Sequence, residues 1–200
     1  MRGLVPIEVA AVIAVAVAPW PDAIPVALPL IVVATIARLV RGRSWGELMK
    51  PGGVGIAAVA GLAALGIAVA LGTPLVEQLT DRGVEWSRFP VVRGNATNLI
   101  AVLLVVGATA LAAELALRGW IVERVLELSR APAVLAILVG GVAEALLVDG
   151  DLAARLGGGA FGCGLGWMYV ASGRNLAVPV CARLAFQLGA VVLEWLRLVG

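Results

Sequence analysis

Residues 97–120 read TNLIAVLLVVGATALAAELALRGW, and this stretch decides the fold. It is apolar enough and long enough to cross a bilayer, since a spanning helix needs about 20 mostly apolar residues. Its backbone must be helical in lipid, because each N–H and C=O group needs a partner within the segment. Glu114 and Arg118 are the charged residues inside it.

The rest of the chain repeats this composition. It is 62% hydrophobic and 14% charged, with a mean hydropathy of +1.04, whereas a soluble domain is about 45–50% apolar and about 25% charged. We therefore predict an all-α, multi-pass transmembrane helical bundle with about seven spans (six to eight). The predicted spans are residues 4–20, 23–40, 54–72, 97–120, 132–148, 153–172 and 175–196.

Seven spans leave only short loops, so residues 1–200 are predicted to form a single membrane domain. Within it we distinguish an N-terminal three-helix part over 1–74, an extramembrane connection over 75–96 and a C-terminal core over 97–196. Charged and apolar residues interleave in the connection, which predicts a short interfacial helix within 75–93.

Two local patterns carry structural predictions. Gly158, Gly162 and Gly166 lie four residues apart and leave one stripe of a span without side chains, which predicts close packing against another helix. The segment from Trp120 to Arg130 carries alternating acids and arginines. We interpret it as a helix that leaves the membrane with a solvated face.

Ionisable residues at membrane depth are the main functional clue, because each costs about 2.5–3.5 kcal/mol at a helix centre. Glu114 and Arg118 are four residues apart and form a pair on one helix face. Glu144 and Arg183, the latter with Gln187 one turn later, have no evident partner on their own helices. We predict that Glu144 and Arg183 pair with each other or join the Glu114–Arg118 pair, so that their three spans meet.

The sequence gives no support for metal, cofactor or nucleic-acid binding. The chain has no histidine, which removes the most common transition-metal ligand and general base. Cys163 and Cys181 fall in apolar runs and are interpreted as small buried hydrophobes. We therefore expect no cofactor and no metal. A net charge of +2 without a basic cluster argues against nucleic acid, so the expected partners are membrane lipids and another membrane protein.

The distribution of basic residues predicts the orientation. One set falls on a single side if the N-terminus is cytoplasmic, and seven crossings then put the C-terminus outside. This set comprises Arg2, Arg38, Arg41, Arg43, Lys50, Arg124, Arg130 and Arg174. Lys50 is the only lysine, which suggests a GC-rich bacterial source and thus a location in the bacterial inner membrane.

The C-terminal half resembles the CPBP family, which includes CAAX prenyl endopeptidases and bacteriocin-processing enzymes. Residues 112–120, AAELALRGW, resemble the family signature E-E-x-x-x-R-G. Residues 159–169 resemble its glycine-rich helix, and residues 172–180 resemble the loop that follows. The resemblance covers residues 97–195 and implies an intramembrane endopeptidase, in which a glutamate and a histidine activate water while a second histidine and an asparagine stabilise the oxyanion.

The residues at those four positions depart from the family pattern. The first glutamate falls on Ala113, and only the second is kept, as Glu114 with Arg118. The two histidines fall on Glu144 and Arg183, and the asparagine falls on Gln187. Alanine cannot take a proton, and arginine stays protonated at pH 7.

These departures leave three hypotheses. The first is a family-like pseudoenzyme that serves as a binding, scaffolding or accessory subunit of a membrane complex. The second is an active endopeptidase with rewired residues and Glu144 as its base. The third is a small transporter component with Glu114, Glu144 and Arg183 along a polar pathway.

Overall fold

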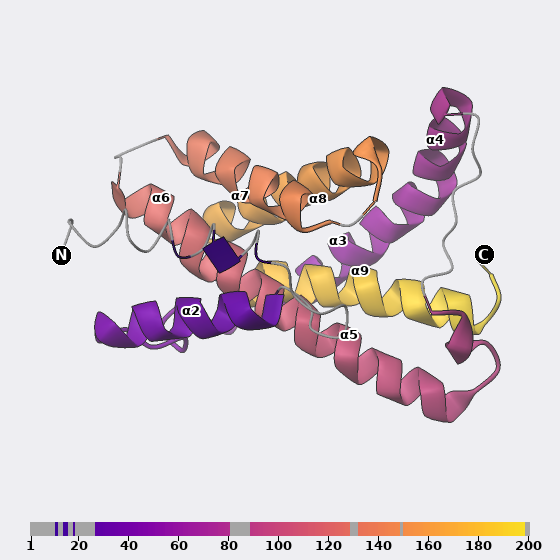
Figure 1. Ribbon diagram of the computed structural model, residues 1–200, viewed down its shortest axis with the longest axis horizontal. Helices are drawn as coiled ribbons and strands as arrows, with labels where there is room; N and C mark the ends of the chain where they lie inside the picture. Colours follow the sequence, from indigo (N-terminus) through magenta and orange to yellow (C-terminus); the bar gives the residue numbers. More distant parts are fainter. Residues whose placement is uncertain are drawn as a thin grey trace. The chain divides into compact units, whose positions relative to one another are not determined.

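The fold is described from a computed structural model, which describes residues 11, 14–15, 18, 27–80, 89–128, 132–148 and 150–198. Every regular element in these ranges is helical, as predicted (Figure 1). In chain order the elements are α2 (Ala27–Val40), α3 (Val54–Ile67), η2 (Ala68–Gly72), α4 (Thr73–Thr80), η3 (Pro90–Val92), α5 (Ala96–Ala116), η4 (Leu117–Val122), α6 (Glu123–Leu128), α7 (Ala133–Leu147), α8 (Leu152–Ala171) and α9 (Ala177–Trp195).

Two π-helical turns join neighbouring helices into longer ones. Element η2 connects α3 to α4, and η4 connects α5 to α6. Figure 1 shows both composite helices as continuous coils. A π-helical turn inside a helix is rare and is found mostly at functional sites, and η4 carries Arg118.

Three helices in the described part of the chain have the length and composition to cross a membrane: Val54–Gln78, Ala96–Glu127 and Ala177–Trp195. The predicted count of seven spans is therefore not confirmed. The apolar helices Leu28–Val40 and Ala133–Leu147 are shorter than the roughly 20 residues that a span needs. Helix α8 has 20 residues, but its glycines and Arg155 dilute its apolar character. Most of the predicted span 4–20 lies outside the described residues.

The connection after the third predicted span differs from expectation. Residues 75–80 continue the helix that begins at Val54, so this helix extends into the predicted connection, and the short interfacial helix within 75–93 stays a prediction. No glycine or proline follows Pro74 within residues 75–80 to stop the helix, and Pro74 comes just after the π-helical turn η2, where the α-helical hydrogen-bond pattern is already interrupted. Residues 81–88 of the predicted interfacial helix lie outside the described residues, and Pro90–Val92 form one 3-10 turn.

The chain divides into two compact units, each built from two separate stretches. The first unit comprises Met1–Gly52 and Leu111–Pro179, and the second comprises Gly53–Ala110 and Val180–Gly200. In the first unit, Leu30 and Ala34 of α2 pack against Ala116 and Trp120.

The second unit has a core of its own. Val92, Val106 and Val191 are buried together there. The carboxylate of Glu194 accepts hydrogen bonds from the backbone N–H of Phe89, at 3.0 and 3.2 Å. This buried carboxylate fixes the segment that precedes α5 against the end of α9.

Helices α7 and α8 lie side by side in the first unit (Figure 1). The glycine stripe of α8 faces α7, as the sequence predicted. A Cβ atom at Gly158 would lie 2.5 Å from Val148 Cγ2, one at Gly162 would lie 2.7 Å from Glu144 Cβ, and one at Gly166 would lie 3.5 Å from Ile137 Cα. The absent side chains therefore set how closely the two backbones approach.

Helices α2 and α8 both end in a C-terminal capping motif that contains a left-handed glycine. Arg43 N–H donates to Arg38 O and Gly42 N–H donates to Leu39 O, the pattern of a Schellman motif. Gly42 takes the required left-handed conformation, with φ of 66°. At the end of α8, Arg174 N–H donates to Tyr169 O and Gly173 N–H donates to Val170 O, and Gly173 is left-handed with φ of 71°.

We predict that Gly162→Ala destabilises the first unit by about 1–3 kcal/mol, because the added methyl group overpacks the contact with Glu144. The matched control is Gly164→Ala, since nothing lies within 4 Å of a Cβ atom at that position. The control should be neutral or stabilising by up to about 1 kcal/mol, from helix propensity. Unfolding in detergent micelles measures both, and equal effects would contradict the packing role of the stripe.

Candidate functional site

The candidate site begins where α5 passes into η4. Glu114 lies on the last turn of α5 and Arg118 on the π-helical turn, and both side chains are fully buried. Arg118 Nη1 donates to Glu114 Oε1 over 3.0 Å. The sequence spacing of four residues, with the acid nearer the N-terminus, favours this pair on one helix face.

Helix α7 supplies a second carboxylate to the same guanidinium. Arg118 Nη1 donates to Glu144 Oε2 over 2.7 Å, and the Glu144 side chain is 8% exposed. Two acids from different helices thus share one cation. A buried ion pair is retained only when additional hydrogen bonds satisfy its remaining groups.

Helix α8 supplies such a bond from its backbone. Arg118 Nη2 donates to Gly162 O over 2.7 Å. A Cβ atom on Gly162 would lie 3.2 Å from that nitrogen and 2.7 Å from Glu144 Cβ, so the bare backbone is what admits the guanidinium. Arg118 therefore binds groups from α5, α7 and α8 at one point, which we call the buried ion cluster (Glu114, Arg118, Glu144).

The remaining predicted site residues are Ala113, Arg183 and Gln187. Ala113, where the resemblance places the first glutamate of the signature, is buried on α5 beside Glu114. Arg183 and Gln187 belong to α9 in the second unit, where Arg183 is buried and Gln187 is half-buried. Pairing of Arg183 with Glu144 stays a prediction.

The chemistry open to the cluster follows from its groups. Carboxylates can accept a proton, whereas a guanidinium is already protonated and has only N–H donors. Among the described residues, no three histidine, cysteine, aspartate or glutamate side chains gather as metal ligands would. The arrangement suits mutual stabilisation of buried charges, with Arg118 as the shared donor.

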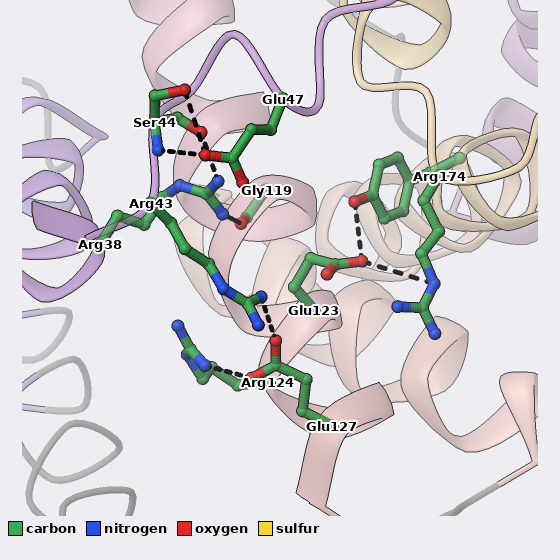
Figure 2. Close-up of polar contacts among 10 residues, drawn as sticks. Arg38, Arg43, Ser44, Glu47, Gly119, Glu123, Arg124, Glu127 and Arg174 are labelled. Atoms are coloured by element: carbon green, nitrogen blue, oxygen red, sulfur yellow. Dashed lines mark hydrogen bonds and ion pairs between the residues drawn. The ribbon is translucent and has the colours of Figure 1, made fainter. Parts of the chain in front are cut away.

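A second polar group lies farther along the same helix, and the sequence analysis missed it. Glu123 and Arg124 are 5% and 3% exposed, so the prediction of a solvated face for this segment is wrong at both positions. Tyr169 Oη donates to Glu123 Oε1 over 2.8 Å, and Arg174 Nε lies 3.7 Å from the same oxygen. Figure 2 shows Arg174 and Glu123 pointing toward each other.

The C-terminal end of α2 meets this region through Arg38. Its guanidinium is buried, lies 4.7 Å from the centroid of the Trp45 ring, and donates to the carbonyl oxygens of Ser44 and Gly119. The Trp45 ring occupies the space beside Gly119, since a Cβ atom there would lie 2.7 Å from the ring. Figure 2 shows Arg38 reaching toward η4.

Asn175 fixes the loop that follows α2. Its Oδ1 atom accepts from the backbone N–H groups of Lys50 (3.0 Å) and Ala177 (3.2 Å), and its Nδ2 atom donates to Gly52 O (3.1 Å). Leu176 N–H donates to Leu48 O over 2.8 Å. The loop after α8, which carries part of the family resemblance, therefore holds the loop before α3.

Comparison with known proteins agrees with the resemblance. Residues 95–189 match the family described as type II CAAX prenyl endopeptidase Rce1-like. This range contains the buried ion cluster, Glu123, Tyr169 and Asn175. No curated protein and no solved structure matches the chain significantly.

We predict that Arg118→Met lowers the free energy of unfolding by about 3–5 kcal/mol, because two carboxylates stay buried without their shared cation. The matched control is Arg43→Met, which removes the partially exposed pair with Glu127 and should cost about 1 kcal/mol or less. Thermal unfolding in micelles compares the two.

Two further substitutions should restore the stability that Arg118→Met removes. Adding Glu114→Gln and Glu144→Gln to Arg118→Met removes the uncompensated charges and should recover stability. If the triple variant is less stable than Arg118→Met alone, the electrostatic account of the cluster is wrong.

Tyr169→Phe should cost about 1–3 kcal/mol, because the buried Glu123 carboxylate loses its phenolic donor. In a Glu123→Gln background the same substitution should cost clearly less, since the acceptor is no longer charged. Tyr169 is the only tyrosine of the chain, so loss of its ultraviolet absorbance signature verifies the substitution. Equal costs in both backgrounds would argue against the Tyr169–Glu123 bond.

Proposed function

We propose, from the match of residues 95–189 to the type II CAAX prenyl endopeptidase Rce1-like family, that the protein is a non-catalytic member whose former reaction centre serves as a structural ion cluster. It would act as a binding, scaffolding or accessory subunit in a membrane complex. The observation that carries the proposal is the bond between Arg118 and Glu144, 2.7 Å long and buried.

Glu144 stands where the resemblance places a water-activating histidine. A general base must present a free acceptor to the proton it removes. Here one carboxylate oxygen accepts from Arg118, and the side chain is 8% exposed. The geometry favours Glu144 as a fixed anion that anchors α7 rather than as a base.

The other positions support the same interpretation. Ala113 has no group that can exchange a proton, and the chain contains no histidine. Glu114 and Arg118, the two signature residues that are kept, bond to each other. The residues that hold the fold together persist, while those to which the resemblance gives chemical roles are replaced.

Location and orientation are part of the proposal. The apolar helices and the family indicate a membrane protein, and we propose the bacterial inner membrane. Arginine and lysine favour the cytoplasmic side of short loops, so we propose that the loop after α2 and the end of α8 face the cytoplasm. The proposed partner is another integral membrane protein.

The deciding experiment is a cleavage assay on the purified protein in proteoliposomes. The substrates are a farnesylated CAAX peptide and a set of transmembrane peptides, and an active family member serves as positive control. We expect no turnover above that of empty liposomes, from the wild type and from Glu144→Gln alike. In parallel, crosslinking in native membranes should yield one defined membrane-protein partner.

Each contrary result points to a different alternative. Turnover that disappears in Glu144→Gln would replace the proposal with an active endopeptidase that uses Glu144 as base. Turnover that persists in that variant would also overturn it and would point to another base. Glu144-dependent solute uptake by the same vesicles would favour the transporter hypothesis instead.

A further inference from the structure

Helices α7 and α8 form an antiparallel hairpin in the first unit (Figure 1). Residues 148–151 connect them, and the contacts of Gly158, Gly162 and Gly166 fall on progressively earlier residues of α7. The only charged residue of α7 is Glu144, which is buried in the ion cluster. The hairpin is therefore apolar along most of its length, and the positions at which its helices end decide how far it reaches across a membrane.

The backbone fixes both ends of each helix. Helix α7 lies between Pro132, with φ of −55° and ψ of 139°, and Val148, which is extended. Helix α8 begins after Asp151, whose carboxylate accepts from Ala154 N–H over 2.9 Å, and ends before the left-handed Gly173. Extended residues have backbone groups that no helix satisfies, so they cannot lengthen the part of the hairpin that lies in hydrocarbon.

Both helices are short for a membrane span. Helix α7 has 15 residues, which corresponds to a length of about 22 Å. Arg155 is exposed on the first turn of α8. The uncharged stretch of α8 is therefore residues 156–171, which have a length of about 24 Å. Since the hydrocarbon core of a typical bilayer is about 30 Å thick, both helices fall short of it by roughly 6–8 Å.

Helix α7 turns apolar side chains outward from its first turn to its last. These side chains follow one another at four-residue intervals on one side of the helix. Each is more than half exposed, and the set comprises Val134, Leu138, Val142 and Leu146. Such a strip requires apolar cover along the whole of α7.

Helix α8 has an outward apolar face of its own, with exposed charge at both ends. Leu156 and Trp167 lie on this face and are each more than half exposed. Asp151 and Arg155 are exposed before the face begins, and Arg174 is 49% exposed after it ends. Tryptophan favours the membrane–water interface, and Trp167 stands about one turn before the end of α8. The apolar cover that α8 requires is thus no longer than the helix itself.

We propose that the α7–α8 hairpin crosses the membrane and thins the bilayer beside it, so that compressed or short acyl chains cover its outward faces. A span shorter than the local hydrocarbon is accommodated by thinning of the bilayer. Tilting would shorten the reach of either helix further. Extension of the Arg155 side chain toward the headgroups adds some reach to α8, but α7 has no arginine or lysine and is the shorter helix. The proposal holds for a catalytic and for a non-catalytic protein alike.

The test is fluorescence quenching of Trp167 by brominated dioleoyl phosphatidylcholine in bilayers that contain the full chain. Unbrominated phosphatidylcholines with shorter (dimyristoleoyl), equal (dioleoyl) or longer (dierucoyl) chains compete with the quencher. The difference between the wild type and Trp167→Phe isolates the signal of Trp167. We expect the dimyristoleoyl lipid to compete about two- to threefold better than the dioleoyl lipid, and the dierucoyl lipid to compete worse, because short chains need no compression.

The matched control places the reporter on a long helix. Leu71 is 67% exposed on the helix Val54–Gln78, whose 25 residues have a length of about 37 Å. In a Trp167→Phe background, Leu71→Trp should report either no preference for the dimyristoleoyl lipid or the reverse preference. A preference found only at Trp167 belongs to the hairpin rather than to the protein as a whole.

Lengthening the apolar face of α8 gives a second test. Arg155→Leu makes all 20 residues of α8 uncharged, a length of about 30 Å. This variant should reduce the preference for the dimyristoleoyl lipid by about half, whereas Arg155→Lys keeps the charge and should leave the preference unchanged. Arg155 is exposed, so neither substitution disturbs the packing of α8 on α7.

Four results would overturn the proposal. Equal competition by the three lipids at Trp167 would mean that the hairpin does not recognise chain length. The same order of lipids in Leu71→Trp would mean that the preference is not local to the hairpin, and an unchanged preference in Arg155→Leu would mean that the length of α8 does not set it. Absence of quenching at Trp167 would mean that a partner protein or a second copy of the chain covers α8 in place of lipid.

Discussion

The first unit depends on one buried guanidinium. Arg118 is fully buried and must find acceptors, since an isolated charge removed from water costs several kcal/mol. It finds them on α5, α7 and α8, through Glu114 Oε1, Glu144 Oε2 and Gly162 O. No two of these helices can slide past each other without breaking one of the bonds, so the charge fixes a register that apolar contacts alone would leave open.

The packing of α7 on α8 and the ion pairs of Arg118 both depend on the missing side chain of Gly162. Gly162 has no side chain, which brings α8 within contact of Glu144 and at the same time exposes the carbonyl oxygen that Arg118 binds. A larger residue there would push the two helices apart and would separate the guanidinium from both the carbonyl and the Glu144 carboxylate. The glycine stripe therefore serves the ion cluster as much as the helix contact.

Part of this arrangement of helices and buried charges could be predicted from the sequence, because it depends on residues close together in the chain. Apolar runs indicated the helices, the four-residue spacing paired Glu114 with Arg118, and the glycine spacing indicated a close contact. The burial of Glu123 could not be predicted, because its donor Tyr169 lies 46 residues away and the alternating charges around it are typical of a solvated helix. The number of spans also escaped prediction, since α2, α7 and α8 are apolar enough to resemble spans but fall short in length or hydropathy.

The helix formed by α5, η4 and α6 carries two separate groups of buried charge. Around Arg118, two carboxylates surround one cation. Beyond the π-helical turn, Glu123 accepts a hydrogen bond from Tyr169 and lies near Arg174, while Arg124 pairs with Glu127. Arg38, which is also buried, donates to the carbonyl oxygens of Ser44 and Gly119 rather than to a carboxylate. This one helix thus carries two separate buried charge groups, one that joins it to α7 and α8 through Arg118 and one that joins it to the end of α8 through Glu123.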